Sequence, residues 1–202
     1  EGHGVGIACL AVQAPVAGVA AVVKAAPEQA GVASVVVAPV TSGATPGVTP
    51  AAPVAVNVSW PAKTFTVPVE VKLAPQEAPA PPAGGAFTPP PTPVPVAGGF
   101  SVGNTVVELT VTDSATGAPL TRFQQPITIH LSAIQAGDTP AYSHDGATWT
   151  KIPRLSSPDL PAGQQDGYFL NADGSVDIFT LHATLFGLLT DSQAPTKPSI
   201  DA

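Results

Sequence analysis

Methionine is absent from this 202-residue chain, and cysteine, positive charge and aromatic side chains are scarce. The one cysteine, Cys9, has no partner in the chain, which excludes a scaffold held by internal disulfides. Lys and Arg total 7 against 14 Asp and Glu, so the net charge of -7 would repel a phosphate backbone. We therefore expect no nucleic-acid partner.

Long uninterrupted apolar runs are also missing, because Pro or Gly breaks every candidate stretch of about 18 residues, and no membrane-spanning helix is predicted. The apolar run Gly4–Val12 is short and no basic segment precedes it, so it is predicted to be a mature N-terminal strand rather than a signal peptide. Since the sequence starts at Glu1, we expect processing from a longer chain. Low charge with abundant Pro, Ala and Thr predicts an extracellular or cell-surface protein.

Proline and glycine are plentiful, at 25 and 19 residues, and Val, Ala and Thr are in excess. Proline interrupts helices, and β-branched residues favour strands. The length allows one large or two small domains with a sizeable core. The sequence therefore predicts an all-β fold, with one or more β-sandwiches of mainly antiparallel strands.

Composition divides the chain into four predicted regions: an apolar β segment at 1–50, a sandwich at 51–132, a hairpin-rich β region at 133–190 and a Pro-punctuated linker or tail at 191–202.

The first region has strand candidates at Val5–Val12, Val16–Val23 and Val32–Val40. It lacks the charges that usually protect edge strands. We therefore expect its strands to pair either in the chain's own sandwich or in a neighbouring copy.

Two segments, Phe65–Val71 and Phe123–Ile129, share a pattern in which Phe is followed three residues later by Pro and then by alternating β-branched residues. Pro opens each predicted strand, where a missing N–H costs least. Between them lies Ala74–Gly99, rich in Pro, Ala and Gly, which we interpret as a long crossover packed on the sandwich rather than an isolated polyproline linker. Phe100–Asp113 then alternates as a half-buried strand, and Ser114–Pro119 forms a turn.

Two turn sequences predict hairpins in residues 133–190. An Asp-Gly pair at 145–146 lies between aromatic-bearing segments, and Trp149 is predicted to anchor this part of the core. The second turn spans 171–177, where Asn171, Asp173 and Asp177 offer side-chain oxygens that suit calcium. The segment is too short for an EF-hand and lacks the bidentate Glu, so a plain turn is the preferred interpretation and no cofactor is expected.

The stretch Thr180–Leu189 (TLHATLFGLL) carries a His-x-Thr triplet and allows two interpretations. In the structural one, the alternation of apolar residues is that of the last strand of a sandwich. In the chemical one, Thr184 attacks the carbonyl of Ala183, His182 assists the proton transfer, and hydrolysis of the resulting ester cuts the chain. The structural interpretation is favoured, because many Thr residues lie near a His in β-rich chains.

The order of several motifs resembles the ZU-type module of ankyrins and netrin receptors, in the form seen in bacterial surface proteins. The motifs are AVNVSWPA, the strands at Phe65 and Phe100, FQQPITIHLS, AYSHDGATW and HATLFGLL, which span roughly residues 50–190. The resemblance implies a β-sandwich of mechanical or interaction type. From the self-cleaving members, it also implies that His182 is the assisting histidine and Thr184 the nucleophile; Ala183 stands where those members carry Leu or Phe.

No motif of an enzyme acting on other molecules is found. The four histidines lack the spacing of a zinc site, and the aspartates of the hairpin region offer no assignable glycosidase pair. His130, on the strand opened by Pro126, is expected to be a satisfied or exposed strand residue.

These observations leave three functions. The preferred one is an extracellular structural module or subunit of a bacterial surface protein or fibre, with other copies of itself or adjoining surface-protein domains as partners. The second is a self-processing domain that cleaves before Thr184. The third is an adhesin or carbohydrate-binding module, with Trp60, Trp149, Tyr142 and Tyr168 as candidate sugar platforms.

Overall fold

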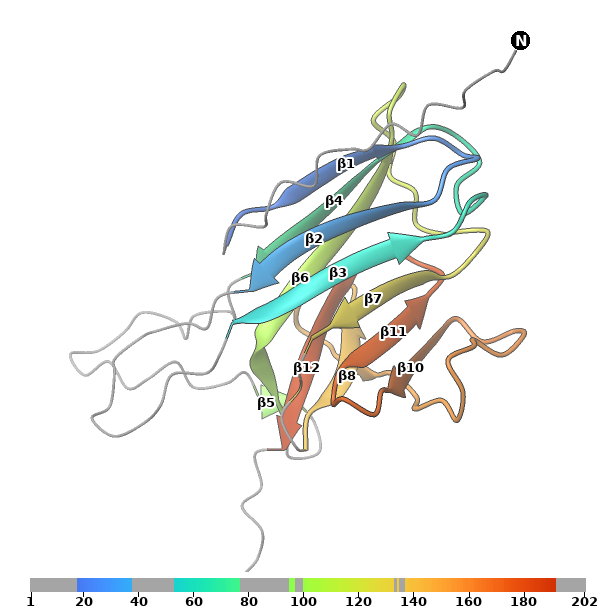
Figure 1. Cartoon of the computed structure of the whole chain (residues 1–202). Helices are drawn as coiled ribbons and strands as arrows, with labels where there is room; N and C mark the ends of the chain where they lie inside the picture. Colours follow the sequence, from blue (N-terminus) through green and yellow to red (C-terminus); the bar gives the residue numbers. More distant parts are fainter. Residues whose placement is uncertain are drawn as a thin grey trace, which may run out of the picture.

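The computed structural model describes residues 18–37, 53–76, 95–96, 100–132, 134 and 137–191. Over this part of the chain the elements are strands, with no α-helix, arranged in two antiparallel sheets that pack face to face (Figure 1). The predicted all-β sandwich is confirmed. The strand candidate Val5–Val12, Cys9 and the tail beyond residue 191 lie outside the described residues.

The larger sheet has the strand order β1-β4-β6-β12-β8-β9, and β5 pairs with β6 beside this path. Its last strand in the sequence, β12, lies in the interior of the sheet and is hydrogen-bonded to β6 on one side and to β8 on the other. The strands are β1 (Ala21–Ala25), β4 (Val69–Gln76), β5 (Pro95–Val96), β6 (Phe100–Asp113), β8 (Thr139–Ser143), β9 (Thr150–Lys151) and β12 (Leu185–Asp191).

The smaller sheet has the order β10-β11-β7-β3-β2. Its strands are β2 (Gly31–Val37), β3 (Val54–Trp60), β7 (Ile127–Leu131), β10 (Asp166–Leu170) and β11 (Val176–Thr180).

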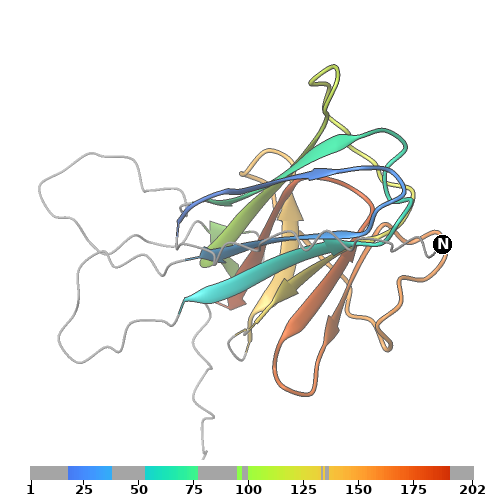
Figure 2. The same cartoon turned by 45° about the horizontal axis from the view of Figure 1, so that its top comes forward.

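The first region contributes β1 and β2, which pair within the chain, β1 with β4 and β2 with β3. These two strands belong to different sheets and lie along one side of the sandwich, as the blue segments of Figure 2 show. A turn closed by a hydrogen bond from the Gln29 N–H to the Ala26 carbonyl, 3.0 Å, joins them. Strands from the first three predicted regions thus share the same two sheets.

The Phe-x-x-Pro segments start one strand in each sheet. β4 begins directly after Pro68 and β7 directly after Pro126, as the sequence predicts. The two phenylalanines, Phe65 and Phe123, are buried and meet edge to face with ring centroids 5.7 Å apart. The repeated pattern therefore closes one end of the core from both sheets.

The Pro-rich segment Ala74–Gly99 connects neighbouring strands rather than crossing between sheets. At its ends lie β4 and β6, which form an antiparallel ladder from Val69 opposite Asp113 to Gln76 opposite Val106. The long Pro-rich connection that the sequence predicts therefore joins two neighbouring strands of one sheet. Residues 77–94 and 97–99 lie outside the described residues.

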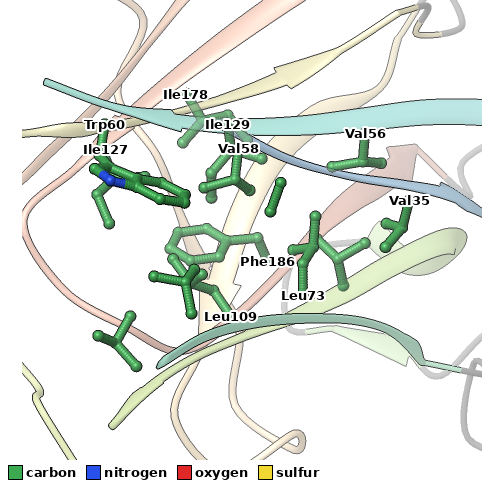
Figure 3. Close-up of a cluster of buried hydrophobic side chains, with 14 of the residues drawn as sticks. Val35, Val56, Val58, Trp60, Leu73, Leu109, Ile127, Ile129, Ile178 and Phe186 are labelled. Atoms are coloured by element: carbon green, nitrogen blue, oxygen red, sulfur yellow. The ribbon is translucent and has the colours of Figure 1, made fainter. Parts of the chain in front are cut away.

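The main core fills the space between the two sheets (Figure 3). Because successive side chains of a strand point to opposite faces, one set of alternate residues from each strand enters this space. The smaller sheet contributes Val35, Val56, Val58, Trp60, Ile127, Ile129 and Ile178, and the larger sheet Leu73, Leu109 and Phe186.

A second apolar cluster covers the other face of the larger sheet. On β6, Val106 belongs to this cluster, whereas its neighbour Val107 belongs to the main core. Trp149 is buried here as predicted, and it packs on Gly187 of β12 so closely that a Cβ at Gly187 would lie 3.0 Å from the indole. A larger residue at 187 would therefore displace Trp149 or bend β12.

In the described part of the chain, there is no helix with the length and apolar character needed to cross a membrane.

Candidate functional site

The His-x-Thr triplet lies in a bend between the two sheets. β11 ends at Thr180 in the smaller sheet, and β12 begins at Leu185 in the larger one. The strand predicted through Thr180–Leu189 is therefore interrupted. The local cause is the Thr180 hydroxyl, which accepts the N–H of His182 at 3.2 Å and turns the backbone away from the extended path.

Thr184 occupies a buried position at the end of this bend, with 8% of its surface exposed. Its hydroxyl donates a short hydrogen bond to the carbonyl of Ser143, and its Oγ1 lies 3.2 Å from Nδ1 of His144. Its own carbonyl accepts the N–H of Leu109 at 2.9 Å. Thr184 thus ties the bend to the two strands, β8 and β6, that flank β12.

Sheet register explains why His144 meets Thr184. β8 and β12 pair with Leu185 opposite Ser143 and Phe186 opposite Tyr142. Extending this antiparallel register by one residue brings Thr184 opposite His144. The two residues are far apart in sequence, so the contact depends on a long-range strand pairing.

The Thr184 hydroxyl carries one hydrogen, which it donates to Ser143. Because the Ser143 carbonyl can only accept, it takes up this single hydrogen, and the Thr184 oxygen can then only accept a hydrogen bond from His144. In this arrangement His144 donates from Nδ1 to Oγ1. In this resting form the hydroxyl is not activated as a nucleophile. Turning the hydroxyl hydrogen toward His144 breaks the hydrogen bond to the Ser143 carbonyl, which costs about 1 kcal/mol.

His182 is directed away from this hydroxyl by a carboxylate. Its Nε2 lies 3.0 Å from Oδ2 of Asp166 and 2.9 Å from Oδ1. Asp166 is buried at the start of β10, and the ring of His182 stacks on Phe186 at 5.9 Å. Nδ1 of His182 is buried without a hydrogen-bond partner. The imidazole that contacts Thr184 is therefore that of His144 rather than that of the triplet.

Two histidines and a tyrosine form one packed cluster around the bend. The rings of His144 and His182 are 5.4 Å apart, and Tyr142 lies 5.3 Å from the first and 5.0 Å from the second. Sequence reasoning missed His144, because it treated the histidines as separate residues. The Asp-Gly turn at 145–146 was the signal that could have indicated it, because this turn places His144 at the end of β8.

The turn that follows His144 is held by the Asp145 carboxylate. Its Oδ1 accepts the N–H groups of Thr148 at 2.7 Å and Ala147 at 2.9 Å, and the Ser143 hydroxyl at 3.0 Å. These bonds, that of Thr148 foremost, lower the pKa of Asp145 to about 2. The carboxylate therefore stays ionised over most of the pH range and fixes the backbone that carries His144.

The calcium candidates Asn171, Asp173 and Asp177 surround the β10–β11 turn, and each takes part in side-chain hydrogen bonds. Asp173 accepts the hydroxyl and the N–H of Ser175, at 2.6 and 2.9 Å, and the Ser175 hydroxyl is the main cause of its lowered pKa. Asp177 accepts Asn171 Nδ2 at 2.9 Å and lies 2.7 Å from Nδ1 of His130, which is satisfied on β7 as expected. Among the described residues, no group of three or more His, Cys, Asp or Glu is placed to hold a metal ion.

The four candidate sugar platforms do not form one exposed surface. Trp60 is buried in the main core and Trp149 in the second cluster. Tyr142 belongs to the cluster around the bend, and Tyr168 packs against the main core. The two tryptophans therefore stabilise the sandwich and are not available for stacking on a sugar ring.

No protein-family model and no curated protein matches this chain.

Proposed function

We propose that this chain is an extracellular structural β-sandwich module, or a subunit, of a bacterial surface protein or fibre, where it spaces, anchors or assembles its neighbours. The observation that carries the proposal is the position of β12, which is hydrogen-bonded along both sides, to β6 and to β8. A force applied at Asp191 is shared by two ladders at once. Such an arrangement suits a module that transmits tension.

Two further features support a mechanical role. Side chains of both faces of β12 are buried, Phe186 in the main core and Leu189 in the second cluster. The polar groups of the bend are also used to hold strands together, because Thr184 links β8 and β6. The resemblance to ZU-type modules supports the same role, with other copies of the chain or adjoining domains as partners.

Forced unfolding of the full chain tethered at its two ends tests this proposal. We expect one cooperative event that releases about 600 Å, from roughly 3.5 Å per residue over the span from β1 to β12. Phe186→Ala should lower the unfolding force, whereas Val22→Thr, an exposed position on the edge strand β1, should leave it unchanged. Early detachment of β12 at low force would contradict a mechanical role.

The approach of His144 to Thr184 favours a second candidate function, a self-processing domain that cleaves before Thr184. The Thr184 oxygen would attack the carbonyl carbon of Ala183 while an imidazole takes the hydroxyl proton. The Ala183–Thr184 C–N bond then breaks, the amine nitrogen takes up a proton, and an ester joins the two residues. Water hydrolyses the ester to a carboxylate on Ala183 and the free hydroxyl and amine of Thr184.

Intact-mass measurement over prolonged incubation tests the second function. Self-processing predicts two fragments that part before Thr184, and Thr184→Ala should abolish them. A single species near 20.1 kDa, unchanged after treatment with hydroxylamine, would exclude it, since hydroxylamine captures an ester that water opens slowly.

A further inference from the structure

We infer that His144 on the β8 turn, and not His182 of the triplet, takes the hydroxyl proton of Thr184 when the chain cleaves itself. This inference rests on the second candidate function above and assigns the base of that reaction.

Geometry distinguishes the two imidazoles. Nδ1 of His144 lies 3.2 Å from the attacking oxygen, within reach of a direct proton transfer. Nε2 of His182 is bound to the buried Asp166 carboxylate, and its Nδ1 is buried without a hydrogen-bond partner. His182 therefore has neither nitrogen bonded to the hydroxyl that must lose its proton.

The tautomer of His144 decides between the resting and the reactive form. With the ring proton on Nδ1, His144 donates to Thr184 Oγ1, and the hydroxyl donates to Ser143. With the ring proton on Nε2, the Nδ1 lone pair accepts the hydroxyl hydrogen once that hydrogen turns away from Ser143. As the Thr184 oxygen bonds to the Ala183 carbonyl carbon, the proton passes to Nδ1. The resulting imidazolium returns a proton to the departing amide nitrogen of Thr184.

His182 has a positioning role in this scheme. Its ring lies 5.4 Å from that of His144 and 5.0 Å from that of Tyr142, while Asp166 fixes its orientation. The His182–Asp166 pair thus supports one side of His144. Loss of His182 should loosen His144 without removing the base.

Time courses of intact mass on full-length variants test the assignment. His144→Phe keeps an aromatic ring in the cluster but has no basic nitrogen, and it should slow cleavage by about 10²–10⁴-fold. His182→Phe should slow cleavage by about tenfold or less, because a positioning residue acts through His144. His130→Phe, on β7 and outside the cluster, is the matched control and should cleave at the wild-type rate.

Chemical rescue separates a base from a packing residue. In His144→Ala the truncated ring leaves space, so imidazole added to the buffer should restore part of the cleavage rate, with no effect on Thr184→Ala. Thermal unfolding of each variant identifies those that fold. If neither His144 variant folds, ring-nitrogen NMR of the wild-type chain replaces them: the inference requires a population of His144 with its proton on Nε2.

The outcomes separate the inference from the function on which it rests. If the wild type cleaves itself, His144→Phe still does so and His182→Phe does not, then His144 is not the base, although the chain is self-processing. A His144 ring protonated on Nδ1 alone under conditions of cleavage would do the same. If the wild-type chain stays whole in hydroxylamine, self-processing is excluded, and the role inferred for His144 is excluded with it.

Discussion

Two His–Asp pairs with nearly the same separation lie in different surroundings. In the β11–β12 bend, His182 and Asp166 are 2.9 Å apart, with 12% and 8% of their side chains exposed. Across strands β7 and β11, His130 and Asp177 are 2.7 Å apart, with 37% and 22% exposed. The same residue types therefore form one buried contact and one partly exposed contact.

Location in the fold, and not residue type, therefore marks the bend as the candidate site. A buried group that loses its hydrogen-bond partner stays unsatisfied, whereas an exposed group can bond to water instead. Around His130, the hydrogen bonds belong to a hairpin turn and its neighbouring strand. Around the bend, one hydrogen bond joins His182 to Asp166, another joins His144 to the buried Thr184, and the two histidine rings are in contact.

The largest effect is expected for Asp166→Ala. It leaves Nε2 of His182 buried without its partner and should reduce the free energy of unfolding by about 3 kcal/mol. Chemical denaturation of the variant and the wild type measures the difference. A loss below about 1 kcal/mol would mean that the bend tolerates an unpaired imidazole, and the contrast between the two pairs would disappear.

An intermediate effect is expected for Thr184→Val, which preserves the shape of the side chain and removes its hydroxyl. The Ser143 carbonyl and His144 Nδ1 both lose a bond, so the free energy of unfolding should fall by about 1–3 kcal/mol. Thr128→Val, at a half-buried position on β7, is the control and should change it by less than about 0.5 kcal/mol. Equal losses in the two variants would show that Thr184 does not hold the bend.

A small effect is expected for Asp177→Ala. The pair with His130 is partly solvated, so its loss should cost below about 1 kcal/mol, even with the additional bond from Asn171. Denaturation at low and high salt checks this value, and the difference should shrink as salt screens the pair. A salt-independent loss as large as that of Asp166→Ala would contradict the role assigned to burial.

The smallest effect concerns acid and the exposed Asp145. Backbone N–H bonds lower its folded-state pKa from 3.8 to about 2, so the carboxylate contributes stability that is fully present above about pH 4. That contribution is lost as the pH falls toward 2. The stability difference between the wild type and Asp145→Ala, followed by thermal unfolding from pH 5 to pH 2, should therefore shrink steadily toward the acid end. A difference that stays constant would show that the turn does not depend on the charge.

Local signals in the sequence predict much of the fold. The alternation in Phe100–Asp113 predicts β6 with its observed bounds, since Val107, Leu109 and Val111 are buried in the main core while the alternate residues 108, 110 and 112 are half-buried. The prolines at 68 and 126 mark the starts of β4 and β7 because their missing N–H groups fall outside the ladders.

Long-range pairing sets the features that the sequence does not predict. The alternation through Thr180–Leu189 continues across a bend, so its period cannot reveal that β11 and β12 enter different sheets. The contact between His144 and Thr184 depends on the register of β8 against β12, which no local pattern encodes. The connection between β4 and β6 is hidden for the same reason, because adjacency in a sheet is decided by partners far apart in the chain.

A pair of double-mutant cycles tests most directly the claim that burial singles out the bend. One cycle combines His182→Ala with Asp166→Ala, and the other combines His130→Ala with Asp177→Ala. We expect a coupling free energy of about 2 kcal/mol or more for the buried pair and below about 1 kcal/mol for the partly exposed pair. Equal coupling in the two cycles would contradict this claim.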